Sequence, residues 1–253
     1  GNSAVMLIED RERSIRLRTL EAQYLRLLIS EEWAKDHFGL SPHSFWSGAS
    51  CRDISTVLSY SRIAAHSGNL AEQIQNRVSD DQAFIGVWHR HTDSGAIEFH
   101  STEPVSEQEF KFGEYKLFID DGVLQKLREL RQHNLPSETG GVLLGYYDFN
   151  VGMIIIADCL PAPEDSKGTS AMFERGIQGL REAIDEVSKR TAGIVRYLGE
   201  WHSHPAGSSS SPSYDDLIQL SELAIGMDED GLPGIVMVIG ENDVSFLQGS
   251  VSS

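Results

Sequence analysis

The most informative stretch of this chain is Glu200-Trp201-His202-Ser203-His204-Pro205, with Pro212-Ser213-Tyr214-Asp215-Asp216 shortly after it. The residues just before the histidines, 194–199, predict a strand. At the end of a strand, two histidines spaced i, i+2 project from the same side of the backbone, whereas on a helix they would point about 200° apart. Two imidazoles, a nearby carboxylate and an open fourth position form the ligand set of a hydrolytic zinc site.

A water molecule activated by zinc needs a proton acceptor, and Glu138 is the candidate. It lies in Pro136-Ser137-Glu138-Thr139-Gly140-Gly141-Val142-Leu143-Leu144-Gly145, directly before two glycines and an apolar run that predicts a buried strand. The two glycines allow the backbone to pass close to a site. In this order, glutamate, Gly-Gly strand, His-Ser-His-Pro and Ser-x-x-Asp resemble the motif of the JAMM/MPN zinc metalloproteases, over roughly residues 113–253.

The resemblance implies a role for each of these residues. His202, His204 and one aspartate would hold zinc, Glu138 would activate the water and later protonate the leaving amine, and Ser213 would help to stabilise the oxyanion. The usual family spacing leads to Asp215, eleven residues after His204, whereas the Pro-Ser-x-x-Asp signature leads to Asp216. We attribute the extra residue to the serine run at 208–211 and prefer Asp216, with Asp215 as the alternative.

Some of these features also have an ordinary structural explanation. Ser213-x-x-Asp216 before an apolar periodic run is the pattern of a helix N-cap with an acidic N3 residue, and one helix start can serve both purposes. A second pair, His89 and His91, follows a predicted strand at 83–87 but lacks a Ser-x-x-Asp and a Glu-Gly-Gly strand. We interpret this pair as exposed polar residues leading into a turn at Asp93-Ser94-Gly95.

Composition narrows the classes of protein to consider. The 253 residues suffice for two domains, and a net charge of −17 argues against nonspecific binding to nucleic acid or anionic membranes. No apolar run reaches the roughly 18 residues that a membrane span needs. Cys51 and Cys159 lie in different halves and no secretory signal is evident, so a cytoplasmic protein without an internal disulfide is expected. Cys159 should be a buried small hydrophobe, whereas Cys51, beside Arg52, is a candidate thioester-forming nucleophile.

Hydrophobic periodicity predicts an α/β (α+β) chain in two parts. Helices at 17–35 and 54–77, the second beginning at Ser55 or Ser59, are followed by strands at 83–89 and 96–100 and a polar linker at 101–108. These elements predict a smaller α+β accessory region over residues 1–112. Residues 113–253 predict a strand, a helix, a hairpin, a helix at 173–190, the strand before the histidines, a helix and two last strands. This is the order that the resemblance implies for an MPN domain, a curved mixed β-sheet flanked by helices.

The N-terminal part carries a second resemblance. The segment Phe45 to Asp53, the helix after it and the strand at 85–88 are similar to the C-terminal tail of ThiF-type adenylyltransferases, the bacterial relatives of ubiquitin-activating enzymes. Such enzymes are sometimes fused to a JAMM domain. An unrelated α+β domain that packs on the protease or positions its substrate is the alternative.

These inferences together predict a zinc-dependent isopeptidase or peptidase of a bacterial ubiquitin-like system. It would hydrolyse the bond after the C-terminal tail of a ubiquitin-like protein, in precursor processing or deconjugation. Its expected partners are that protein or its conjugates, with ubiquitin-activating-like and conjugating-like enzymes in addition, and neither nucleic acid nor membrane. Two alternatives stay open: a catalytically silent MPN scaffold, which would usually have lost ligands, and a zinc hydrolase that trims a sulfur-carrier protein.

Overall fold

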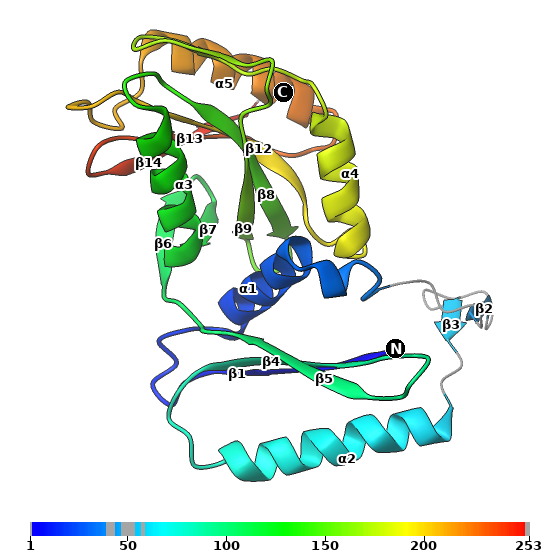
Figure 1. The fold of residues 1–253 in the computed structure, drawn as a ribbon. Coiled ribbons are helices and arrows are strands. Elements are labelled where there is room, and N and C mark those ends of the chain that lie inside the picture. The colour runs from blue at the N-terminus through cyan, green and yellow to red at the C-terminus, as the bar shows by residue number, and fades with distance from the viewer. Residues whose placement is uncertain (1, 39–43, 47–53, 57–58, 251–253) are drawn as a thin grey trace. The chain divides into compact units, whose positions relative to one another are not determined.

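The structure is a computed structural model that describes the chain except residues 1, 39–43, 47–53, 57–58 and 251–253 (Figure 1). It divides into two compact units, Gly1–Pro104 and Val105–Ser253. The division falls earlier than the boundary expected after residue 112, because residues 107–112 form a strand of the larger sheet. Cys51 and most of the segment at 45–53 lie outside the described residues, so the thioester hypothesis and much of the resemblance to ThiF tails stay predictions.

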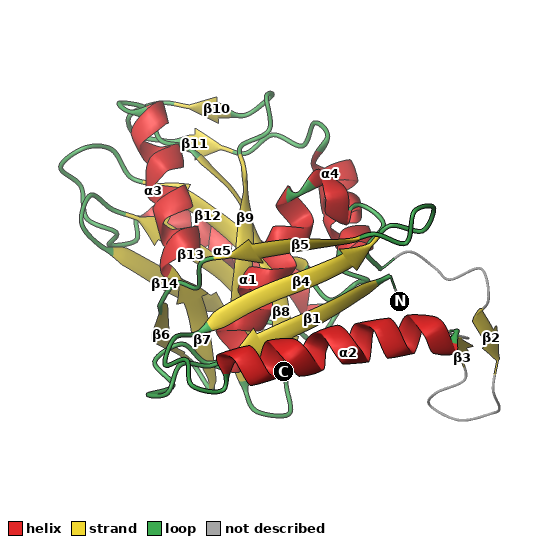
Figure 2. Ribbon diagram, turned by 60° about the horizontal axis from the view of Figure 1, so that its bottom comes forward, coloured by secondary structure: helices red, strands yellow, loops and turns green. Residues whose placement is uncertain are grey.

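The N-terminal unit is built on a three-stranded antiparallel sheet in the order β1-β4-β5, which Figure 2 shows with α2 running alongside it. Its elements are β1 (Ser3–Ile8), α1 (Leu17–Ser30), the 3-10 helix η1 (Glu32–Ala34), β2 (Ser44–Trp46), β3 (Ile54–Thr56), α2 (Tyr60–Arg77), β4 (Phe84–Arg90) and β5 (Ile97–Thr102). Helix α2 begins after its N-cap Ser59, the later of the two predicted starts, and Leu70 packs it against Met6 and Trp88. Strand β1 was not predicted from the sequence.

The C-terminal unit is a seven-stranded mixed sheet in the order β14-β13-β12-β8-β9-β7-β6. Its elements are β6 (Glu107–Phe112), β7 (Tyr115–Asp120), α3 (Asp121–Asn134), β8 (Gly140–Asp148), β9 (Met153–Pro161), β10 (Lys167–Gly168), β11 (Phe173–Glu174), α4 (Leu180–Arg190), β12 (Arg196–Ser203), α5 (Tyr214–Asp228), β13 (Gly234–Ile239) and β14 (Val244–Gly249). The expected curved mixed sheet flanked by helices is confirmed. Among the described residues, no helix combines the length and the apolar character that crossing a membrane requires.

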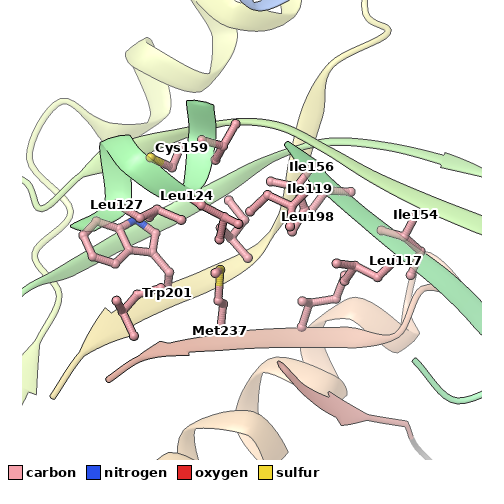
Figure 3. Close-up of a cluster of buried hydrophobic side chains, with 14 of the residues drawn as sticks. Leu117, Ile119, Leu124, Leu127, Ile154, Ile156, Cys159, Leu198, Trp201 and Met237 are labelled. Atoms are coloured by element: carbon pink, nitrogen blue, oxygen red, sulfur yellow. The ribbon is translucent and has the colours of Figure 1, made fainter. Parts of the chain in front are cut away.

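Helices cover both faces of the large sheet, and strand β13 shows this most clearly. All six of its residues are buried, as expected of a strand covered on both sides. Ile235 and Met237 belong to the core that α3 covers, whereas Val236 and Val238 contact Leu220 of α5. Figure 3 shows the α3 side, where Leu124 and Leu127 lie among Trp201, Met237 and the buried Cys159. The prediction that Cys159 is a buried small hydrophobe is confirmed.

The segment between β9 and α4 differs from the helix predicted over 173–190. The helix starts only at Leu180, and the preceding residues form the short hairpin β10–β11. Gly179 has a φ of 69°, a left-handed conformation that stops a helix from extending backwards. The Asp165 carboxylate accepts hydrogen bonds from the backbone N–H groups of Ile177 and Gln178, which ties this connection down. The helical periodicity before Leu180 was therefore misleading. The β10–β11 hairpin, which takes the place of the first part of the predicted helix, borders the candidate site.

Candidate metal centre and active site

Strand β12 fixes the two histidines of the His-Ser-His-Pro stretch. His202 pairs in register with Val238 of β13 and with Gly140 of β8. Because Val238 faces α5, its parallel neighbour His202 points to the same side of the sheet. The strand ends at Ser203, and the His204 N–H donates to the Ile239 carbonyl, which holds the second histidine beside the first.

Helix α5 supplies the carboxylate on that same face. Ser213 is its N-cap and forms a capping box with Asp216, in which the Ser213 Oγ accepts from the Asp216 N–H and the Asp216 Oδ2 accepts from the Ser213 N–H. Asp216 is buried, whereas Asp215 is exposed. The His202 Nε2 lies 3.0 Å from the Asp216 Oδ1, and the His204 Nε2 lies 3.4 Å from the Asp216 Oδ2. The cap pattern and the site pattern are thus combined in one helix start.

The donor set fits a metal ion. The potential ligand atoms of His202, His204 and Asp216 all lie within 4.8 Å of one another. Bonds of about 2.1 Å in a tetrahedron separate ligand atoms by about 3.4 Å, close to the distances observed here. Both ring nitrogens of His202 are buried, and neither makes a hydrogen bond to any described residue, although Nε2 lies against the Asp216 carboxylate. A buried nitrogen without a hydrogen-bond partner is energetically costly, and a cation between the three side chains would provide a partner for the His202 Nε2.

Two interactions prepare the site for a cation. The His204 Nδ1 lies 2.7 Å from the Ser209 carbonyl and can only donate to it, which in the neutral ring favours the tautomer whose Nε2, 3.4 Å from the Asp216 carboxylate, can bind a metal. Burial alone would raise the pKa of Asp216, but the neighbouring His202 and the hydrogen bonds with Ser213 outweigh it and hold this pKa well below its usual range. Asp216 is therefore ionised, as a metal ligand must be.

Glu138 lies on the loop that leads into β8, two residues before Gly140, the cross-strand partner of His202. Its N–H donates to the Thr169 carbonyl of the β10–β11 hairpin at 2.7 Å. The approach is so close that a Cβ added to Gly168 would lie 2.2 Å from the Glu138 carbonyl oxygen. Burial raises the pKa of the Glu138 carboxyl, and the Asp216 charge adds to this, against the opposing effect of His204 and His202. Desolvation of this kind is common in carboxylates that exchange protons.

All the predicted site residues line one cavity of about 690 Å³. The lining includes the triad of His202, His204 and Asp216, together with the N-cap Ser213 and Asp215 in the first turn of α5. Ala171, Met172 and Phe173 of the hairpin contribute an apolar wall to the lining, and Met172 is half exposed. The structure therefore brings together the residues that the sequence selected, including both candidate aspartates, but only Asp216 is within reach of the histidines.

Several residues that support the site were not found from the sequence. The buried Arg131 of α3 donates from Nε to the His204 carbonyl and from Nη2 to the Pro205 carbonyl, both at 2.9 Å. The serine run also proves to be anchored, since the Ser210 N–H donates to Asp243 and its carbonyl accepts from Ser245. These contacts join residues that lie far apart in the chain, so no local sequence pattern predicts them.

A second group of supporting residues surrounds Glu200, which lies two residues before His202 and to which the sequence assigned no role. This buried carboxylate accepts hydrogen bonds from Arg175 at 2.7 Å, from Gln219 at 2.8 Å and from the Tyr197 hydroxyl at 3.3 Å. It thereby connects the hairpin side of the cavity, through Arg175, to α5, through Gln219. Only the alternation along β12 could have suggested it, because Glu200 and His202 face the same way.

The sequence around this site matches a known protein family. The sequence model of a family described as prokaryotic homologs of the JAB domain matches residues 120–248, just over half of the chain. The chain belongs to this family. The match covers Glu138, the histidine pair and both aspartates, so the resemblance to JAMM/MPN proteases inferred from the sequence is confirmed.

Curated relatives of this JAB-domain chain are named as isopeptidases or as a metalloprotease. A CD-NTase/cGAS isopeptidase of Enterobacter hormaechei subsp. hoffmannii is 34% identical over 104 residues, covering 41% of this chain and 56% of the relative. Another protein of that name, from Escherichia coli, is 28% identical over 138 residues, covering 51% of this chain and 84% of the relative. A probable metalloprotease of Sinorhizobium fredii is 31% identical and covers 40% of this chain and 60% of the relative. The chain thus spans little more than half the length of the first of these proteins.

Proposed function

We propose that the chain is a zinc-dependent isopeptidase that hydrolyses the bond after the C-terminal tail of a ubiquitin-like protein. The observation that carries the proposal is the convergence of His202, His204, Asp216 and Glu138 on one cavity. Two imidazoles and one carboxylate, with no fourth protein ligand among the described residues, leave a position open as catalytic zinc sites do. Zinc bound there would polarise the scissile carbonyl and lower the pKa of a coordinated water from about 15.7 to about 7.

The protein residues would then divide the work of hydrolysis. The Glu138 carboxylate accepts the proton of the attacking water and later donates it to the leaving amine nitrogen, and its raised pKa suits both steps. The Ser213 hydroxyl donates a hydrogen bond to the developing oxyanion while its oxygen continues to cap α5. Arg131 holds the His204-Pro205 backbone, and so keeps the second histidine in place.

The substrate class is supported by the relatives and by the wall of the cavity. Two relatives are named isopeptidases, enzymes that cut the bond between a carboxyl group and a side-chain amine. The apolar wall at 171–173 offers contacts for an extended chain that would lead its carbonyl to the metal. The N-terminal unit contributes none of these side chains, and we assign it the role of an accessory domain.

The proposal is tested with ubiquitin and bacterial ubiquitin-like proteins joined through their C-terminal carboxyl to a lysine side chain. The zinc-loaded chain is expected to release the intact ubiquitin-like protein, with mass spectrometry placing the cut directly after its last residue. A chelator should stop the reaction, and added zinc should restore it. Binding of the conjugates without any cleavage by the zinc-loaded chain would instead support the silent scaffold.

Substitution of Ser213 separates its two roles. Ser213→Gly removes the hydroxyl but, because glycine is tolerated at an N-cap, should lower the free energy of unfolding by only a few tenths of a kcal/mol. Loss of one oxyanion donor should nevertheless lower kcat by about 10²-fold. Ser213→Thr keeps both cap and hydroxyl and should stay close to wild type in both measurements. A Ser213→Gly variant with wild-type kcat would reduce Ser213 to a helix cap.

A further inference from the structure

The N-terminal unit carries a second group of potential metal ligands, on the hairpin formed by β4 and β5. The register pairs His89 with Glu98 and Val87 with His100. Because side chains alternate along a strand, His89 of β4 shares one face of the sheet with Glu98 and His100 of β5. His91 follows the last residue of β4, and its ring lies beside that of His89, with centroids 5.5 Å apart. Trp88 and Phe99 point to the opposite face, where Trp88 packs with Leu70 of α2. The pair His89-x-His91 thus meets Glu98-x-His100 across the hairpin.

Two of these histidines converge on one oxygen of the Glu98 carboxylate. The Glu98 Oε2 lies 3.0 Å from the His91 Nε2 and 3.7 Å from the His100 Nε2. The His100 Nε2 is buried and makes no hydrogen bond to any described residue, although it points at the carboxylate. An unsatisfied buried nitrogen beside a carboxylate and a second imidazole is what a cation site looks like before the ion binds.

Surrounding groups hold two of the histidines in position. The ring of Trp33 stacks on His100 with centroids 3.9 Å apart and planes 6° from parallel, which restricts rotation of the His100 imidazole. The Ser3 Oγ lies 3.0 Å from the His89 Nδ1, and the His89 and His91 rings are 5.5 Å apart. Ligands fixed by neighbouring packing are a feature of real metal sites.

We infer that His91, Glu98 and His100 form a second binding site, for a divalent first-row transition-metal ion. Imidazole and carboxylate donors together suit zinc, cobalt, nickel or copper. The inference does not depend on the proposed protease activity, because it uses other residues in the other unit. An ion bound there would connect β4 to β5 beside the turn at 91–96 and stabilise this hairpin.

Binding would need a small movement of side chains. Among the described residues, only His202, His204 and Asp216 already hold their ligand atoms within 4.8 Å of one another. The side chains of His91 and Glu98 are 46% and 53% exposed, so both can rotate toward the fixed His100. The second site should therefore bind its ion more weakly than the first.

The test is a metal titration of the full chain that carries His202→Ala and His204→Ala, which removes the first site. Zinc, competed against a chromophoric chelator, is expected to bind at one equivalent and to raise the melting temperature. Adding His91→Ala or Glu98→Gln should weaken this binding at least about tenfold. Nickel should quench part of the tryptophan fluorescence, and Trp33→Phe should abolish that quenching.

A histidine outside the proposed second site serves as the control. His133→Ala, at an exposed position of α3, should leave the zinc affinity of the double variant unchanged. His91 and Glu98 are both exposed, so their variants should fold even if a change at the stacked His100 does not. The inference is overturned if the double variant binds no zinc, or if His91→Ala and Glu98→Gln bind as tightly as their parent.

Discussion

Glu138→Gln is expected to lower kcat by about 10²- to 10⁴-fold and to leave the zinc content unchanged. Glutamine has the shape of glutamate but cannot accept the proton of the attacking water. Glu138 is not among the three residues whose ligand atoms converge, and its backbone is held independently by the Thr169 carbonyl. Single-turnover cleavage and elemental analysis of the same preparation measure the two quantities.

A matched change at another glutamate of the cavity controls for lost negative charge. Glu222 lines the same cavity from α5, and Glu222→Gln should change kcat far less than Glu138→Gln does. If Glu138→Gln lost its zinc in parallel with its activity, Glu138 would be a ligand and the assigned proton transfer would be wrong.

Asp216→Ala is expected to lower zinc affinity by more than about 100-fold, whereas Asp215→Ala should leave it within a few fold of wild type. Loss of an outer partner of a ligand already costs about 10- to 100-fold, and loss of the ligand itself should cost more. The buried Asp216 carboxylate touches both histidines, whereas Asp215, one residue away, is exposed. Zinc dissociation constants of the two variants, measured by competition with a chelator, give the comparison.

Stability must be measured beside affinity, since Asp216 also belongs to the capping box of α5. Loss of its bond to the Ser213 N–H should lower the free energy of unfolding by about 1–3 kcal/mol. Urea denaturation shows whether the variant is still folded at the temperature of the titration. The reverse order of zinc affinities in folded variants would transfer the ligand role to Asp215.

Much of the candidate site could be predicted because several of its residues lie close together in the sequence. His202 and His204 share one strand end, and Ser213 and Asp216 share one helix start, so spacing alone groups them. The choice of Asp216 over Asp215 also rests on local physics, because only residue N3 of the helix can return its carboxylate to the N-cap.

The parts that escaped prediction depend on contacts between distant segments or on weak patterns. Strand β6 alternates polar residues with Phe110 and Phe112, and the linker predicted at 101–108 took in its polar first two residues. The contacts of Arg131 with the His204-Pro205 backbone connect a helix to a loop far along the chain.

The second histidine pair illustrates the same limit. His89 and His91 were interpreted from β4 alone as exposed polar residues of a strand, and the structure leaves His89 only partly exposed. Their possible partners Glu98 and His100 come into view only with the register of β5. Pairing between strands is not encoded in the spacing within one strand.

The most direct test of the central claim is elemental analysis of the purified chain beside His202→Ala, with His133→Ala as the control. After reconstitution with zinc and removal of weakly bound ions, wild type and His133→Ala should each hold one zinc ion per chain more than His202→Ala does. Equal zinc contents in all three proteins would contradict a metal centre at His202, His204 and Asp216.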